Sequence, residues 1–245
     1  MVMSGFVGRS AYYLYKLVWT SIDWLYPPQC GGCGTDGSRW CLDCQVKIQR
    51  IPSTICHRCG RLLESVDLCD QCHRSPPPYV AVRTWAVFGG SLRNAIHRLK
   101  YKGDIALGEI LARPLLDMLK ALEWEIDLVT PVPIGVARQK ERGYNQAALL
   151  ALPVALGLCK KYNPRALMKI RETRSQVNLS NRQRYENVID AFLAQGDCVS
   201  GKSVLVIDDV TTSGATLESC SFALVNAGAR QVFCLTLARS AYDLY

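Results

Sequence analysis

Four closely spaced pairs of cysteines constrain this chain more than any other feature. All eight lie within the first 72 of 245 residues, at Cys30 and Cys33, Cys41 and Cys44, Cys56 and Cys59, and Cys69 and Cys72. Two intervening residues let a tight turn direct both thiolates at one metal ion, and two such turns complete a tetrahedral site with four sulfur ligands. The spacing therefore predicts two structural Zn²⁺ sites.

The pairing of these cysteines follows most simply from chain order, with the first four on one ion and the last four on the other. Spacing alone leaves an interleaved pairing open. Gly34 and Gly60 directly follow the second cysteine of a pair, where a backbone wrapped around a metal often needs a positive φ. A disulfide scaffold is the alternative, but it lacks a secretory context, and a redox pair would not need four copies. His57 and His73 are interpreted as bystanders beside the ligands.

The charge of the chain favours anionic partners. Lys and Arg number 29 and Asp and Glu number 21, which gives a formal net charge of +8. Such an excess favours phosphates, nucleic acid or acidic lipid, although two zinc sites with four thiolates each would reduce it to about +4. The hydrophobic fraction of 49% excludes a wholly disordered chain.

No stretch of the sequence is typical of a membrane span or an export signal. The most apolar early segment, residues 11–20, contains Lys16 and is far shorter than the roughly 20 apolar residues that a span requires. No small-residue cleavage site follows it. We therefore expect a cytoplasmic protein with reduced thiols and no transmembrane segment.

Three consecutive prolines, Pro76 to Pro78, mark a boundary after the cysteines, because they hold the chain extended and cannot start a strand ladder. We expect an N-terminal helix in residues 1–26, a double zinc-ribbon module in 27–75 and an α/β domain in 79–245. The Tyr-, Trp- and Leu-rich segment 6–26 favours a helix packed on its own protein over a helix on a membrane surface.

Helical and strand patterns alternate after the prolines. Strands are predicted at 80–88, 126–132, 188–193, 203–207 and 231–237, and helices from a Ser91 cap and at 105–122 and 145–156. Strands separated by helical stretches predict an α/β fold, with an open parallel sheet flanked by helices.

The most informative segment is 204–216. Its apolar residues 204–207 predict a buried central strand, and Asp208 and Asp209 follow at the carboxyl end, where ligands of open parallel sheets bind. A helix follows, with Leu217, Ser221 and Leu224 on one face. The turn between strand and helix is rich in hydroxyls and comprises Thr211, Thr212, Ser213, Gly214, Ala215 and Thr216.

This turn has the chemistry of a sugar-phosphate site. Backbone N–H groups at a helix start, joined by Thr and Ser hydroxyls, bind a phosphate monoester. Asp208 and Asp209 repel that phosphate but can accept hydrogen bonds from neighbouring sugar hydroxyls. The predicted ligand is therefore a ribose 5-phosphate. An ordinary acidic turn is the alternative, and the combination of buried strand, paired acids and hydroxyl turn argues against it.

Residues 204–216 resemble the phosphoribosyl-diphosphate (PRPP) motif of type I phosphoribosyltransferases. The cysteine pairs, with Leu-Lys-Tyr-Lys-Gly at 99–103, Pro-Val-Pro at 131–133 and Arg-Gly-Tyr-Asn-Gln at 142–146, make the whole chain similar to the ComF family. The match is weakest before Tyr26 and across 150–168. The resemblance implies a double zinc ribbon followed by a type I phosphoribosyltransferase-like domain that binds PRPP together with Mg²⁺.

The resemblance also implies roles for individual residues. Asp208 and Asp209 would hold the ribose, and the segment after Val132 would hold the pyrophosphate through cations. A mobile loop over 171–187 would close over the reacting centre. The cations of the pyrophosphate segment are Arg138, Lys140 and Arg142, and the hood that faces the acceptor would include Lys100, Tyr101 and Lys102.

Two main functions are compatible with these residues. The first is transfer of a phosphoribosyl group to an unidentified acceptor, with release of pyrophosphate. Thr212 stands where hypoxanthine and guanine salvage enzymes carry an Asp, which argues against those bases. The alternative is an accessory protein of DNA uptake or processing that binds single-stranded DNA or a helicase, with the PRPP site as a sensor or relic. A third possibility is an inert scaffold that carries a structural zinc module.

Overall fold

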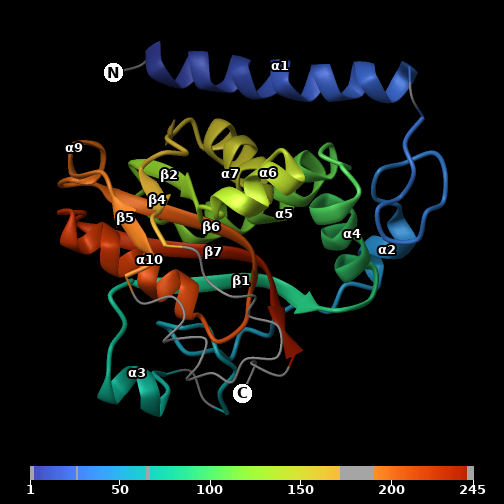
Figure 1. Ribbon diagram of the computed structural model, residues 1–245. Helices are drawn as coiled ribbons and strands as arrows, with labels where there is room; N and C mark the ends of the chain where they lie inside the picture. Colours follow the sequence, from blue (N-terminus) through green and yellow to red (C-terminus); the bar gives the residue numbers. More distant parts are fainter. Residues whose placement is uncertain (1–2, 26, 65–66, 172–189, 242–245) are drawn as a thin grey trace.

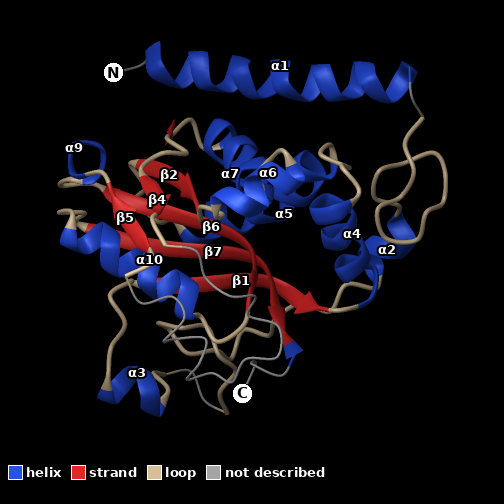
Figure 2. Ribbon diagram, viewed as in Figure 1, coloured by secondary structure: helices blue, strands red, loops and turns tan. Residues whose placement is uncertain are grey.

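A five-stranded, all-parallel sheet forms the centre of the protein (Figures 1 and 2). The computed structural model describes residues 3–25, 27–64, 67–171 and 190–241. The strand order is β1 (Ala81–Phe88), β7 (Gln231–Ser240), β6 (Ser203–Thr211), β2 (Leu128–Pro131) and β3 (Lys161–Tyr162). The predicted open parallel sheet flanked by helices is confirmed.

Helices cover both faces of this sheet, so its central strand β6 is buried on both sides. Leu205 and Ile207 lie in one hydrophobic core, and Val204 and Val206 lie in the other. This double burial explains the continuous apolar run in β6, because a strand that is buried on both faces has no solvent-facing positions for polar residues. The first core includes α4 (Gly90–Tyr101), α5 (Leu107–Leu122) and α7 (Gln146–Gly157), and the second includes α10 (Ala215–Asn226).

The two cysteine-rich ribbons, residues 30–46 (the first) and 56–74 (the second), pack on opposite faces of the sheet. Cys30 and Cys44 of the first ribbon join the core that contains Leu205, whereas Cys56 and Cys72 of the second join the core that contains Val204. The first ribbon carries α2 (Leu42–Val46) and the second carries α3 (Asp70–Arg74), and the two helices lie far apart in Figure 1. The ribbons therefore contribute to the same cores as the sheet.

The segment between the ribbons covers the edge strand β1. Val87 N–H donates to the Gln49 carbonyl at 2.8 Å, and Ile51 N–H donates to the Trp85 carbonyl at 3.4 Å. From the second ribbon, the Arg58 carbonyl accepts from Val82 N–H at 2.7 Å. These bonds satisfy backbone groups that an open sheet edge would otherwise expose to pairing with another chain.

Gly60 lets the second ribbon approach β1 closely. Its φ is +69°, and a Cβ at this position would lie 2.8 Å from the Val82 carbonyl oxygen. A larger residue would therefore both strain the turn and push the ribbon off the strand.

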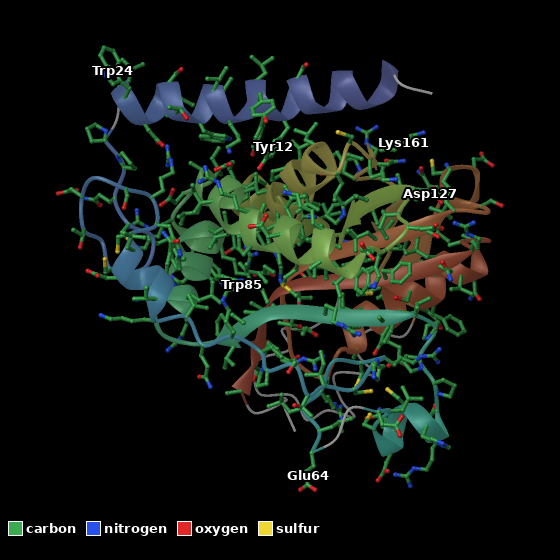
Figure 3. All side chains as sticks on the ribbon, turned by 180° about the vertical axis from the view of Figure 1, so that it is seen from behind. Tyr12, Trp24, Glu64, Trp85, Asp127 and Lys161 are labelled. Atoms are coloured by element: carbon green, nitrogen blue, oxygen red, sulfur yellow. The ribbon has the colours of Figure 1, made fainter. Side chains whose placement is uncertain are left out.

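The first helix, α1 (Met3–Leu25), lies over α7 in Figure 1 and contacts it. Its end is attached to the first ribbon by Arg39, which forms ion pairs with Asp23 and Asp104. Trp24 projects away from the body of the protein and is 85% exposed (Figure 3). Among the described residues, no helix has both the length and the apolar character needed to cross a membrane.

Three details differ from the sequence prediction. Ser91 does not cap α4: Gly89 occupies the cap position, and the Ser91 hydroxyl donates to the Cys44 carbonyl at 3.1 Å. The strand predicted at 188–193 is β5 (Phe192–Ala194), with 188–189 outside the described residues. It pairs antiparallel with β4 (Leu167–Lys169) in a separate small sheet. Finally, β6 continues through both aspartates to Thr211, because its pairing with β7 extends that far.

Candidate functional site

The eight paired cysteines form two clusters. The first four in chain order make one cluster, and the last four make the other. Within each cluster, the sulfur atoms lie within 4.8 Å of one another. Cys30 Sγ lies 3.5 Å from Cys41 Sγ, and Cys59 Sγ lies 3.7 Å from Cys69 Sγ. Four sulfurs about 2.3 Å from a tetrahedral Zn²⁺ would be about 3.8 Å apart, so the geometry fits this ion. The clusters are Cys30, Cys33, Cys41 and Cys44, and Cys56, Cys59, Cys69 and Cys72.

The two clusters repeat one local architecture. In the first, the Cys41 N–H points at Cys30 Sγ at 3.4 Å, and in the second the Cys69 N–H points at Cys56 Sγ at the same distance. Cys41 and Cys69 each precede a short helix, α2 or α3. The sulfur positions thus support the sequential pairing and give the interleaved pairing no geometric support.

The two aspartates of the predicted sugar-phosphate motif occupy the carboxyl end of β6. Asp209 is 2% exposed and Asp208 is half-buried. The Asp209 N–H donates to Asp208 Oδ1 at 2.8 Å. Burial and the neighbouring Asp209 carboxylate raise the pKa of Asp208 well above its usual range. The pair is therefore divided into one carboxyl that retains its proton more readily and one that stays ionised.

Lys100, at the end of α4, keeps Asp209 ionised. Burial alone would raise the pKa of Asp209, but an ion pair with the Lys100 ammonium outweighs it and holds this pKa below its usual range. Gln146 Nε2 also donates to Asp209 Oδ1, at 3.4 Å. Asp209 thus accepts contacts from α4 and α7 at the point where β6 ends.

Arg142 continues this network away from the aspartate. Its Nη1 donates to Gln146 Oε1 at 2.9 Å, and its guanidinium carbon lies 4.8 Å from the centre of the Tyr101 ring. Its Nη2 reaches the Tyr101 hydroxyl at 3.3 Å. Among the described residues, the buried Arg142 Nε has no hydrogen-bond partner. This arginine therefore keeps an unused donor and is connected to Asp209 through Gln146.

The stretches that carried the family resemblance bond to one another. The Tyr144 hydroxyl donates to the Leu99 carbonyl at 2.6 Å, and Asn145 Nδ2 donates to the Val132 carbonyl at 2.9 Å. Asn145 also caps α7, since its Oδ1 accepts from the Ala147 N–H at 2.9 Å. The segments 99–103, 131–133 and 142–146 are thus connected by hydrogen bonds, and Lys100 and Gln146 of this unit contact Asp209.

The hydroxyl turn after β6 leads directly into α10, as predicted. Gly214 has a φ of +88°, a conformation that residues with a side chain rarely adopt, and α10 begins at Ala215. The Ser213 hydroxyl oxygen accepts from the Ala215 N–H at 3.5 Å. On α10, Leu217, Ser221 and Leu224 are all buried, which confirms their predicted shared face.

The remaining predicted site residues have different surroundings. Arg138 is half-buried and Lys140 is exposed on α6 (Val136–Arg142). This helix follows β2 at the carboxyl end of the sheet, where Asp208 also lies. The predicted loop 171–187 lies outside the described residues apart from Arg171. Lys100, which was expected to face the acceptor, forms an ion pair with Asp209, and the sequence did not predict this contact.

Comparison with known proteins identifies the family. A model of the double zinc ribbon domain matches residues 21–73. The chain is 32% identical over 194 residues to the DNA utilization protein YhgH of Escherichia coli, covering 76% of this chain and 85% of the relative. It is 29% identical over 206 residues to the competence protein ComFC of Streptococcus pneumoniae, covering 83% and 89%. The chain belongs to the ComF family.

Another ComF relative is the competence protein F of Haemophilus influenzae, 27% identical over 208 residues, with 82% of this chain and 90% of the relative covered. Among solved structures, the chain is similar to a glutamine PRPP amidotransferase from B. subtilis, with a TM-score of 0.36 and 22% identity over 58% of this chain and 27% of that one. It is also similar to an adenine phosphoribosyltransferase from Thermoanaerobacter pseudethanolicus, with a TM-score of 0.36 and 16% identity over 57% and 83%.

Proposed function

We propose that this ComF protein binds PRPP at the carboxyl end of β6 and transfers its phosphoribosyl group to an acceptor. The observation that carries the proposal is the succession of the buried Asp209, the half-buried Asp208 and the hydroxyl turn that starts α10. The N–H groups of that turn suit a 5′-phosphate, and the two carboxyls suit the ribose hydroxyls.

The pyrophosphate end of PRPP would meet the cations of α6. Because β2 and β6 are parallel neighbours, both strands end at the same end of the sheet. Arg142 offers the buried Nε that lacks a partner among the described residues, and Arg138 and Lys140 lie on the same helix. Guanidinium groups bind phosphate oxygens through paired hydrogen bonds, which suits a leaving pyrophosphate.

The reaction asks for positioning more than for covalent catalysis. The bond between the anomeric carbon and pyrophosphate breaks with its electron pair on the leaving oxygen, and the acceptor forms the new bond to that carbon. Mg²⁺, held mainly by substrate oxygens, would supply further positive charge to the pyrophosphate. Asp209, oriented by Lys100 and Gln146, would fix the ribose, and Asp208 with its raised pKa can either donate to or accept from a sugar hydroxyl.

Calorimetry with PRPP and Mg²⁺ on the zinc-loaded protein tests this function. We expect saturable binding that is lost when Asp208→Asn and Asp209→Asn are combined. Asp197→Asn, on the short helix α9 (Gly196–Val199), is the matched control and should bind normally. Pyrophosphate release would then be measured with candidate amines and bases. Absence of heat with PRPP would overturn the proposal.

A second function is favoured by the names of the relatives, which are a DNA utilization protein and two competence proteins. In this alternative, the ribbons and basic surface bind single-stranded DNA or a helicase. The measurement is the affinity for a single-stranded oligonucleotide over a range of salt concentrations. A steep linear fall of log affinity with log salt would support it, because phosphate contacts release counterions.

A further inference from the structure

A cavity joins the second ribbon to the hydroxyl turn. Its volume is about 250 Å³, smaller than that of pockets for drug-sized ligands, and Ser213 of the turn forms part of its wall. The opposite wall belongs to the second ribbon and includes Arg61, Gln71 and the cluster residues Cys59 and Cys72. The cavity therefore extends the proposed phosphate site towards the ribbon.

Residues from β7, from α10 and from the segment before β1 complete this cavity. Arg239 is 3% exposed, and its Nη2 donates to the Cys59 carbonyl at 2.6 Å, so its position depends on the ribbon. In the register of β6 and β7, Arg239 lies beside Thr211, the last residue of β6, after which the hydroxyl turn follows. Tyr79 is 5% exposed and lines the cavity with Glu218, from the first turn of α10.

The charges around the cavity argue against a second phosphate. Arg61 and Arg239 supply two positive charges, but Cys59 and Cys72 of the second cluster lie in the same wall. With Zn²⁺ bound, the four thiolates of that cluster would carry a net charge of about −2. The carboxyl of Glu218 adds acceptor oxygens, and burial raises its pKa. The cavity thus favours a neutral group with hydrogen-bond donors and acceptors and some apolar surface, which describes a nucleoside.

We propose that the second ribbon completes a subsite for the nucleoside on the 5′ side of the phosphate held by the turn. The ligand class is then the 3′-terminal dinucleotide unit of a single strand. One phosphodiester would lie on residues 211–216, the terminal sugar with its free 3′-hydroxyl would lie at Asp208 and Asp209, and the preceding nucleoside would lie between Ser213 and Arg61. This inference rests on the proposed phosphate site, and it assigns the ribbon a direct part in binding.

Two small ligands separate this inference from the proposed function. Thymidine 5′-monophosphate reaches only the turn and the aspartates, whereas thymidylyl-thymidine adds the preceding nucleoside. Binding of both would be measured by calorimetry on the zinc-loaded full chain. Arg61→Ala should weaken the dinucleotide about tenfold, as expected for a lost hydrogen bond to a charged donor, and leave the mononucleotide unchanged. Arg74→Ala, in an exposed arginine of the same ribbon outside this cavity, should change neither.

A second variant and a modified ligand keep the result decisive. Gln71→Ala, exposed on α3, should also weaken only the dinucleotide, and a 3′-phosphate on thymidylyl-thymidine should abolish its binding by repulsion at the aspartates. If wild type and both ribbon variants bind the dinucleotide with equal affinity, the inference is overturned. The proposed function then still stands, provided that the protein binds the mononucleotide and PRPP. If the wild-type protein binds neither the mononucleotide nor PRPP, both the inference and the proposed function are overturned.

Discussion

Lys100 and Asp209 form an ion pair between the end of α4 and the carboxyl end of β6, with the aspartate side chain 3% exposed. A buried carboxylate without its cation is costly, because neither water nor another charge compensates it. The pair therefore links the stability of the fold to the charge state of the proposed ribose site.

Replacing the cation tests this link. Lys100→Met should lower the free energy of unfolding at neutral pH by about 3 kcal/mol, since it leaves a buried charge unpaired. Urea unfolding of the zinc-loaded protein is the measurement. Lys102→Met, in an exposed lysine two residues later, is the control and should stay within about 0.5 kcal/mol of wild type. Equal stability of the two variants would show that the ion pair is not needed.

Asp208 should make the protein less stable as the pH rises. Its pKa is raised in the folded state by burial and by Asp209, so the folded protein binds this proton more tightly than the unfolded chain does. The stabilisation is therefore full below the unfolded pKa of about 3.9 and is lost as the pH rises through the folded pKa. Asp208→Asn removes this dependence.

The expected readout is the difference in unfolding free energy between Asp208→Asn and wild type, which should grow in favour of the variant from acid to neutral pH. Asp209 acts in the opposite direction. Its lowered pKa gives a stabilisation that is present above about 3.9 and lost as the pH falls through the folded pKa. A difference between variant and wild type that does not change with pH would contradict the raised pKa of Asp208.

Gln146 should connect the arginine to the aspartate energetically. Gln146→Met keeps the volume but removes the bonds to Arg142 and Asp209, and should cost about 1–3 kcal/mol because both charged groups are left short of a partner. Gln139→Met, on the exposed surface of α6, is the matched control. The hypothesis fails if a double-mutant cycle with Arg142→Met gives no coupling between positions 142 and 146.

The second metal cluster should stabilise the sheet as well as its own ribbon. Cys56, Cys59 and Cys72 share a core with Val82 of β1 and Val204 of β6. Cys59→Ser should therefore lower bound zinc from two ions to one per chain and also lower the melting temperature of the whole protein. Cys198→Ser, outside both clusters, is the control. Clearly less than two zinc per wild-type chain would contradict two complete sites.

Local patterns in the sequence predicted those features of the structure that depend on residues close together in the chain. The Cys-x-x-Cys spacing predicted the eight metal-ligating cysteines, and chain order favoured the sequential grouping that the structure shows. The apolar run before Asp208 predicted β6, because a doubly buried strand needs no polar residue. The hydroxyl turn between β6 and α10 was predictable for the same reason, since strand, acids and hydroxyls follow one another directly.

Contacts between distant segments were not predictable in this way. Nothing near Lys100 indicates that α4 directs it at Asp209, and Ser91 has the composition of a helix cap although its hydroxyl bonds the first ribbon. The placement of the ribbons on opposite faces of the sheet depends equally on long-range packing. Gln146 was visible only as part of the 142–146 stretch, and its role emerged from the fold.

The most direct test of the proposed sugar-phosphate site is a crystal structure of the zinc-loaded protein with PRPP and Mg²⁺. We expect the 5′-phosphate on the backbone N–H groups of residues 213–216 and the ribose hydroxyls within hydrogen-bond distance of Asp208 and Asp209. Density for PRPP elsewhere on the chain, with this turn in contact with protein side chains alone, would contradict it.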